Sequence, residues 1–217
     1  MESGNLGTPP TRNRVMGRAL NATVARAPWL WPLLRRPMRA YFDDSAQGWD
    51  DRVGARSAEY LAPLSAASTY VSPAPERILD LGTGTGEGAL LLAREFPTAS
   101  IRGIDVSEEM IRKAQRKVGL DPQGRVAFRV GDAAALPWDP DSFDLVSQLN
   151  VPPFFGEIAR VLRPGGHYIA AASLGSHTPF YTPPSVLERG LKRRGLEVVA
   201  AGEVGIGTYL VARAGPA

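Results

Sequence analysis

Short apolar runs alternate with segments of helical composition from residue 77 onward, and this alternation restricts the fold more than any other feature. The runs predicted to be strands cover residues 77–82, 100–106, 126–132, 143–149, 167–174, 196–203 and 208–213. The segments predicted to be helices between them cover residues 88–95, 108–118, 155–162 and 184–194. Strands separated by helices in this way form a parallel sheet with helices on both faces. The sequence therefore predicts an α/β protein with a doubly wound sheet.

The first 40 residues differ from the rest in charge. They hold seven arginines and one acidic residue, Glu2, so their net charge is +6, whereas the whole chain carries +3. Their beginning is rich in Gly, Pro, Thr and Asn, which is typical of a disordered tail, and three prolines then interrupt a weakly helical pattern. We predict a basic, partly disordered and partly helical N-terminal arm over residues 1–40 and one domain over residues 41–217.

Composition excludes several kinds of site. The chain has no cysteine and two histidines, His167 and His177, which excludes a disulfide scaffold, a thiol nucleophile and a three-histidine metal site. We therefore expect no metal. No segment approaches the roughly 18 apolar residues that span a bilayer, and the first residues lack the pattern of a secretory signal, so we expect a cytoplasmic protein. The part after the arm has a net charge of −3, which argues against nucleic acid as a partner.

A glycine-rich loop follows the first predicted strand. The strand closes with Asp80, and Gly82, Gly84 and Gly86 come at every second position after it. Glycines let a backbone turn sharply and approach a ligand closely, and ligands of open α/β sheets bind outside the carboxyl ends of the strands. The loop satisfies the loose dinucleotide fingerprint, with Ala89 at its last position.

Acidic residues decide between the cofactors. Glu87 would stand at the helix N-terminus, where a dinucleotide places its pyrophosphate, and Asp80 adds a second carboxylate. These charges favour a cationic ligand without phosphate, and S-adenosylmethionine, with its ammonium and sulfonium groups, fits. The next two strands also end in acids: Asp105 is placed to bind ribose hydroxyls, and Asp132 to accept from an exocyclic amine such as that of adenine.

Four stretches resemble the class I S-adenosylmethionine-dependent methyltransferases, in particular the small-molecule branch that includes the quinone-biosynthesis C-methyltransferases. They read ILDLGTGTGEGALLLAREFP, IRGIDVSEEMIRKAQRK, VGDAAALPWDPDSFDLV and EIARVLRPGG. The resemblance covers about residues 41–213. It implies a Rossmann-like fold with a mostly parallel seven-stranded sheet, an antiparallel C-terminal strand and a small-molecule acceptor.

The resemblance also implies roles for individual residues. Phe42 and Trp49 match an aromatic helix that closes over the cofactor in this branch. The residues implied to bind S-adenosylmethionine are Asp80, Gly82, Thr83, Gly84 and Gly86 at the methionine end, Asp105, Val106, Met110, Asp132 and Ala133 around the ribose and adenine, and Gln148, with Asn150, near the methyl group.

Candidate catalytic residues lie after the fourth and fifth strands. His177 is our candidate general base, with Tyr181 beside it, and an ordinary polar loop residue is the alternative interpretation of His177. Asn150 precedes Val-Pro-Pro-Phe, which we interpret as a rigid turn, because Val151 has no side-chain acceptor for a target amine. His167 lies at the opposite sheet edge and is interpreted as structural.

Three functions stay open at this stage. The first is methylation of a small, apolar, aromatic or quinone-like acceptor. The alternatives are an RNA or DNA methyltransferase that uses the basic arm, and a non-catalytic cofactor-binding regulator. The arm has three possible interpretations: it is a solvated extension, it forms a lid over the acceptor pocket, or it contacts an anionic membrane surface peripherally. Both a monomer and a homodimer are compatible with the sequence.

Overall fold

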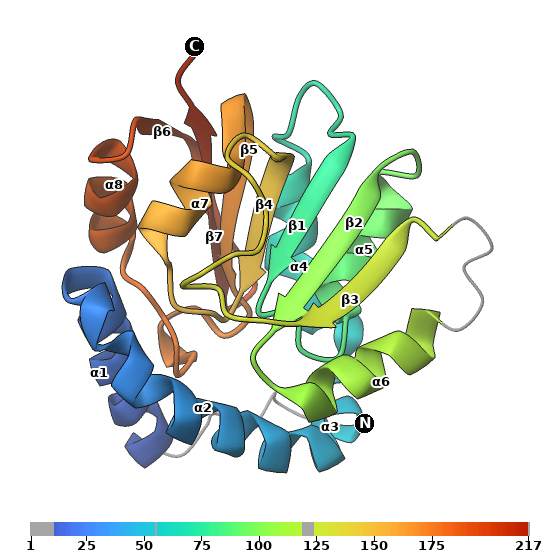
Figure 1. Cartoon of the computed structure of the whole chain (residues 1–217), viewed down its shortest axis with the longest axis vertical. Helices are drawn as coiled ribbons and strands as arrows, with labels where there is room; N and C mark the ends of the chain where they lie inside the picture. The colour runs from blue at the N-terminus through green and yellow to red at the C-terminus, as the bar shows by residue number, and fades with distance from the viewer. Residues whose placement is uncertain (1–10, 55, 119–123, 217) are drawn as a thin grey trace.

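A computed structural model describes residues 11–54, 56–118 and 124–216 of the chain. Its centre is a seven-stranded sheet with the order β3-β2-β1-β4-β5-β7-β6, seen in Figure 1. The strands β1 to β5 are parallel, and β7 pairs antiparallel with both β5 and β6. The strands are β1 (Arg77–Leu81), β2 (Ser100–Asp105), β3 (Val126–Val130), β4 (Phe143–Leu149), β5 (Leu162–Ala172), β6 (Leu196–Val204) and β7 (Gly207–Ala214). The predicted mostly parallel sheet with an antiparallel C-terminal strand is confirmed.

Helices cover both faces of the sheet. On one face, α4, α5 and α6 pack on side chains such as Ile78 and Ile101, and on the other, α7 and α8 pack on neighbours such as Leu79 and Ile104. Successive strand residues point to opposite faces, so each strand contributes to both apolar layers. The helices are α1 (Thr11–Arg26), α2 (Trp31–Ser45), α3 (Trp49–Gly54), α4 (Ser57–Ser68), α5 (Glu87–Glu95), α6 (Glu108–Val118), α7 (Phe155–Val161) and α8 (Pro184–Lys192), with short 3-10 turns at Pro28–Leu30, Ala46–Gly48 and Gly175–His177.

One strand begins earlier than predicted. The strand expected over residues 167–174 is β5, which starts at Leu162 because Leu162 already pairs with Phe143, so residues 163–166 belong to the strand. The glycines there form an irregularity between two paired stretches, with Gly165 at φ +75°. Before the first strand, the segment from Trp49 to Ser68 is divided into two helices, α3 and α4.

The N-terminal arm is more regular than its prolines suggested. Residues 1–10 of the predicted disordered tail lie outside the described residues, whereas α1 begins at Thr11. Pro28 starts a 3-10 turn, but Pro32 falls in the first turn of α2, where proline costs no hydrogen bond. The helix α2 continues through Pro37 and past residue 40, so the backbone shows no break where we placed the boundary between arm and domain.

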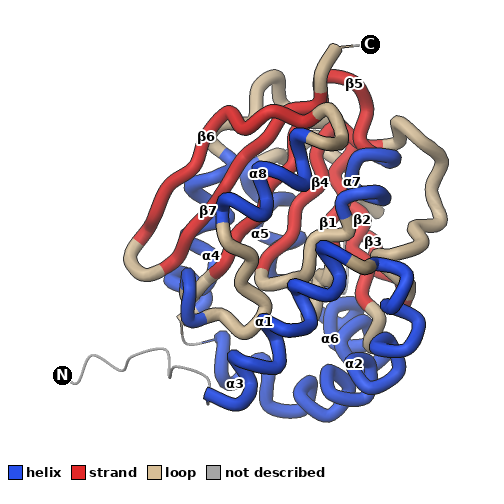
Figure 2. The backbone as a smooth tube through the Cα atoms, turned by 90° about the vertical axis from the view of Figure 1, so that its left-hand side faces the viewer, coloured by secondary structure: helices blue, strands red, loops and turns tan. Residues whose placement is uncertain are grey.

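The arm crosses the molecule at the carboxyl ends of the parallel strands. Figures 1 and 2 show α1, α2 and α3 running along this edge, far in sequence from the loops that they approach. Leu20, Trp31 and Met38 are buried there in a cluster with Phe154 and Phe180. In addition, Asn21 donates to the backbone oxygen of Phe180 and to the Thr182 hydroxyl. The described part of the arm is therefore packed on the domain rather than solvated.

Candidate functional site

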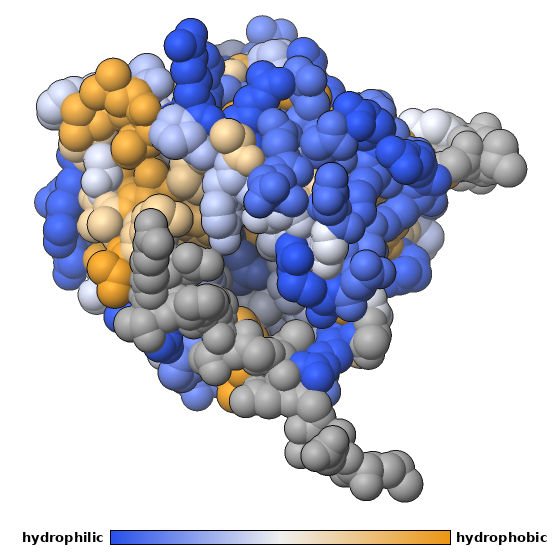
Figure 3. Space-filling model, turned by 90° about the horizontal axis from the view of Figure 1, so that it is seen from below, coloured by the Kyte–Doolittle hydropathy of each residue, from blue (hydrophilic) through white to orange (hydrophobic). Residues whose placement is uncertain are grey.

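A cavity of about 710 Å³ lies between the arm and the carboxyl ends of the strands. This volume is within the usual range of small-ligand sites, roughly 300–1,000 Å³. Figure 3 looks onto this face from below, where the surface is hollowed near its centre. One end of the cavity is formed by the glycine loop and acidic strand ends, and the other by apolar side chains of the arm and of the loops after β4 and β5.

The glycine loop has the shape that its sequence predicts. Gly82, Gly84 and Gly86 have φ values of +60°, +54° and +89°, which L-residues with a side chain rarely adopt. Gly86 is the N-terminal cap of α5. A Cβ at Gly84 would meet no atom within 4 Å, so the backbone at the middle of the loop borders open space on the cavity.

Asp80 lies buried beneath this loop, with 2% of its surface exposed. Its two oxygens accept hydrogen bonds from Thr83 Oγ1 at 2.7 Å and Ser147 Oγ at 2.8 Å. Burial, helped by the nearby charge of Asp105, raises the pKa of Asp80 to about 6, and the two hydrogen-bond donors partly oppose this rise. The side chain is therefore a carboxylate whose charge a cationic ligand would stabilise.

Asp105 closes β2 and borders the same cavity. Its oxygens accept from the backbone N–H groups of Gly84 and Ser107, both at 2.9 Å. These two bonds fix the carboxylate between the glycine loop and the start of α6. Burial raises the pKa of Asp105, and the backbone donors partly oppose that effect. Around it, Val106, Met110, Gly131 and Ala133 complete this end of the lining.

Asp132, the third acid, is engaged by the arm. Its Oδ1 accepts from Trp31 Nε1 at 2.8 Å and from the Ala134 N–H, and its Oδ2 pairs with Arg35 at 3.2 Å. Asp132 is not among the residues that line the cavity. The three predicted acids thus share one edge of the sheet, but this one binds α2 in the structure.

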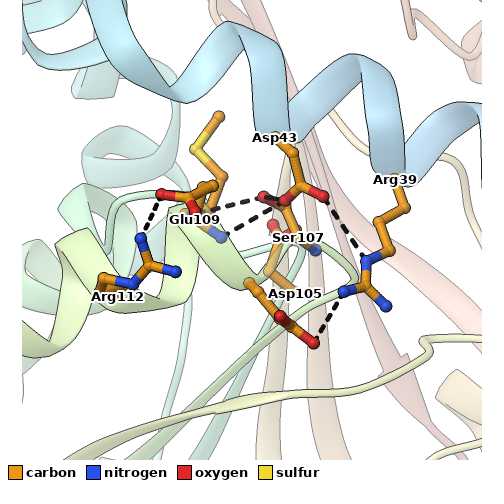
Figure 4. A network of polar contacts seen from close by, with 8 residues as sticks. Arg39, Asp43, Asp105, Ser107, Glu109 and Arg112 are labelled. Atoms are coloured by element: carbon orange, nitrogen blue, oxygen red, sulfur yellow. Dashed lines mark hydrogen bonds and ion pairs between the residues drawn. The ribbon is translucent and has the colours of Figure 1, made fainter.

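A second set of polar contacts joins α2 to α6. Asp43 accepts from the Ser107 hydroxyl at 2.6 Å and from the Glu109 N–H, and Arg39 pairs with Asp43 and, at 2.7 Å, with Glu108. Figure 4 shows these groups converging from the two helices beside Asp105. Ser107 in turn caps α6 by accepting from the Met110 N–H. The arm is therefore bound to the loops that follow β2 and β3.

Glu87 has a partner that the sequence did not indicate. Lys117 Nζ lies 2.7 Å from Glu87 Oε1 and 2.7 Å from Asp50 Oδ1, and it donates to Thr85 Oγ1 at 2.9 Å. Lys117 offsets part of the negative charge of Glu87, which was the argument against a dinucleotide at this loop. It also joins α3, the glycine loop and α6 at the edge of the cavity.

A connected set of polar side chains lies at the ends of β4 and β5. Asn150, with φ +61°, donates through Nδ2 to Tyr60 Oη and to Ser173 Oγ, both at 3.0 Å. It accepts from the Ser173 N–H at 2.9 Å, while the Ser173 hydroxyl donates to the Tyr60 carbonyl at 2.7 Å. Burial raises the pKa of Tyr60 to about 12, so its hydroxyl keeps its proton at neutral pH. Tyr60 and Asn150 both line the cavity.

The other residues predicted near the reacting atoms lie elsewhere. Gln148 is buried beside the cavity rather than on its lining, and its Nε2 donates to the Val151 carbonyl. His177 is exposed, with Nδ1 3.1 Å from Arg14 Nη1, and neither it nor Tyr181 is part of the lining. A catalytic role of these two residues stays a prediction without geometric support. His167, predicted to be structural, is buried in β5, and burial lowers its pKa.

Apolar side chains form the end of the cavity away from the acids. Trp31 packs edge-on against Phe154 with ring centroids 5.0 Å apart, and Phe42 lies 5.6 Å from Phe180. We call this end the apolar chamber. Its lining residues are Leu20, Trp31, Met38, Phe42, Phe154, Leu174, Pro179 and Phe180.

The lining as a whole fits S-adenosylmethionine. Among the described residues that border the cavity, the acids are Asp44, Asp80, Glu87 and Asp105, and the one cation is Arg52. A site with this charge suits a ligand that carries an ammonium and a sulfonium. The open backbone at Gly84 and the carboxylate of Asp105 would hold its methionine and ribose parts.

Comparison with known proteins agrees with this geometry. Residues 78–166 match the family described as a methyltransferase domain. The fold and this match support the resemblance to class I, S-adenosylmethionine-dependent methyltransferases that the sequence showed.

The relatives indicate the branch that this domain resembles. It is 38% identical over 145 residues to the malonyl-[acyl-carrier protein] O-methyltransferase of Methylococcus capsulatus. This alignment covers 63% of this chain and 51% of the relative. It is 32% identical over 144 residues to the demethylmenaquinone methyltransferase of Symbiobacterium thermophilum, or 61% and 57% of the two chains. The chain thus spans about half the length of these curated relatives.

The fold also occurs among solved structures. A Haloferax volcanii methyltransferase, solved with the Trm112 methyltransferase activator, superimposes with a TM-score of 0.66. The match covers 80% of this chain and 97% of the other at 21% sequence identity, and it supports the fold alone.

Proposed function

We propose that this chain transfers a methyl group from S-adenosylmethionine to a small, apolar acceptor. The observation that carries the proposal is the single cavity in which an acidic, glycine-lined end continues into the apolar chamber. The demethylmenaquinone methyltransferase named above acts, by its name, on a quinone, which is an acceptor of this kind. When bound, the cofactor supplies an electrophilic methyl group on its sulfonium.

The chain's own residues would bind and orient the two reactants. Asp80 would face the ammonium group and Asp105 the ribose hydroxyls, because both carboxylates border the cavity at the ends of adjacent strands. The arm would exclude water, since α2 is tied to Asp132 and to the start of α6. Proximity and orientation of bound reactants can supply roughly 7–11 kcal/mol of catalysis. A general base is needed only where the acceptor must lose a proton.

Two alternatives are less consistent with the structure. A nucleic-acid substrate would draw on the arginines of the arm, yet three of its seven are engaged within the protein: Arg18 donates to the Ser176 carbonyl, and Arg35 and Arg39 pair with carboxylates. A non-catalytic cofactor-binding regulator would have no need of the apolar chamber beside its cofactor.

Labelled cofactor tests the proposed function. We expect the protein, incubated with S-adenosylmethionine that carries a radioactive methyl group, to label compounds in the organic phase of a host-cell extract. Protein heated beforehand is the control. Label confined to nucleic acid, or saturable cofactor binding without any transfer, would favour one of the two alternatives instead.

We further propose a peripheral contact between the arm and an anionic membrane surface. Trp29 and Leu33 are 74% and 75% exposed, and Arg26 and Arg36 are exposed near them in the sequence. Aromatic and aliphatic side chains flanked by arginines suit the membrane interface. No helix in the described part of the chain is long and apolar enough to cross a membrane.

Vesicle sedimentation tests this contact. We expect more protein to sediment with vesicles that contain phosphatidylglycerol than with phosphatidylcholine alone. Replacing Trp29 and Leu33 together by alanine should reduce the bound fraction severalfold, because two exposed apolar side chains would no longer enter the interface. Replacing the exposed Val199 on β6 by alanine is the matched control. Equal binding by the double variant would contradict the contact.

A further inference from the structure

The Tyr60 hydroxyl stands where the two ends of the cavity meet. The Tyr60 hydroxyl accepts from Asn150, and the Tyr60 backbone carbonyl accepts from Ser173. Asn150 and Ser173 follow β4 and β5, and the chain after these strands forms part of the apolar chamber. On its other side, Asp80 and Glu87 are near enough to influence its charge. An acceptor in the chamber would meet the methyl group at this junction.

The hydrogen bonds around Tyr60 leave its proton available to a ligand. The two Nδ2 protons of Asn150 go to Tyr60 and Ser173, and the Ser173 hydroxyl proton goes to the Tyr60 carbonyl. The Tyr60 oxygen thus accepts a bond from Asn150, and the Ser173 hydroxyl is also close enough to lower the pKa of Tyr60. Among the described residues, however, no hydrogen bond of normal geometry takes the Tyr60 hydroxyl proton. A buried donor without a partner costs free energy, and a ligand atom would satisfy it.

The surrounding charges select the kind of ligand atom. A carboxylate at this point would face Asp80 and Glu87, whereas the cofactor's own carboxylate has a cationic partner on the lining, Arg52. An uncharged oxygen avoids this repulsion and still accepts a hydrogen bond.

We propose that the Tyr60 hydroxyl donates to an uncharged carbonyl or hydroxyl oxygen of the acceptor and thereby sets which acceptors are bound. Tyr60 is then a specificity-determining residue, positioned by Asn150 and Ser173. This inference rests on the proposed function and narrows its substrate class to apolar molecules that carry an oxygen beside the methylated atom.

Two probes that differ in a single group test the inference. In 2-acetylnaphthalene a carbonyl oxygen takes the place of the methylene group of 2-isopropenylnaphthalene. With saturating S-adenosylhomocysteine, calorimetric titration should show that the wild-type protein binds the ketone about two- to tenfold more tightly, the usual effect of one neutral hydrogen bond. In Tyr60→Phe this preference should disappear. Tyr41→Phe, which removes a hydroxyl elsewhere on the lining, should keep it.

Several results would overturn the assignment. Preference for the ketone in Tyr60→Phe would show that another group binds the oxygen. A severalfold loss of S-adenosylhomocysteine affinity in that variant would assign Tyr60 to the cofactor. Binding of neither probe to the wild-type protein would contradict the chamber itself. Titrations of the two probes without S-adenosylhomocysteine measure the effect of Tyr60 even if the chain binds no cofactor. Failure of this inference is therefore distinguishable from failure of the proposed function.

Discussion

Replacing Asp105 by alanine is expected to raise the Kd for S-adenosylhomocysteine at least 100-fold. The carboxylate is held by Gly84 and Ser107 at the edge of the cavity, where it would accept from both ribose hydroxyls. Hydrogen bonds to a charged group contribute roughly 1.5–3 kcal/mol each, and about 1.4 kcal/mol corresponds to a factor of ten. Isothermal titration calorimetry measures the change.

A second acid at the same edge of the sheet provides the control. Asp132→Asn keeps an acceptor for Trp31, and its carboxylate does not line the cavity, so we expect its Kd to change less than tenfold. Circular dichroism shows whether Asp105→Ala remains folded. If the alanine variant is unfolded, Asp105→Asn, which keeps one acceptor oxygen, is titrated in its place. A Kd within tenfold of wild type for both Asp105 variants would disprove the ribose assignment.

The affinity for S-adenosylhomocysteine should also fall about tenfold between pH 7 and pH 5. Burial raises the pKa of Asp80 to about 6, and the ligand's ammonium group needs the ionised carboxylate. Below the pKa, each pH unit therefore lowers the binding constant about tenfold. Calorimetric titrations at several pH values, in buffers of equal ionic strength, give the profile.

The same pKa has the opposite effect on the stability of the free protein. The pKa of Asp80 in the folded state lies above its ordinary value of 3.8. Its contribution to the free energy of unfolding is therefore largest below pH 3.8 and is lost as the pH rises through 6. Asp80→Asn should remove this part of the pH dependence of both stability and binding. An unchanged binding profile in that variant would show that Asp80 is not the titrating group.

The amino-acid sequence was sufficient to locate Asp80, Asp105 and the glycine loop. The apolar runs define buried parallel strands, and parallel strands deliver the residues after their carboxyl ends to one edge of the sheet. For the same reason Asn150, directly after β4, lies on the lining of the cavity, and its position near the methyl group stays a prediction. The helix predicted over residues 108–118 has the same bounds in the structure, as α6.

The path of the loops and of the arm could not be predicted in this way. His177 and Tyr181 follow β5 by several residues, and the 3-10 turn at Gly175–His177 directs them away from the cavity. Pro32 and Pro37 suggested an interrupted arm, yet burial of Trp31 and Met38 accompanies a continuous α2. Packing against distant residues outweighs such local signals.

The sequence alone determined the sheet and the acidic, glycine-rich edge at its carboxyl ends, because both depend on local periodicity and on residues next to strand ends. Only the tertiary structure decided that Asp132 accepts from Trp31, that Lys117 pairs with Glu87, and that Tyr60 accepts from Asn150. These partners lie 101, 30 and 90 positions apart. No periodic pattern connects residues at such separations, so their contacts arise only when the helices and loops pack together.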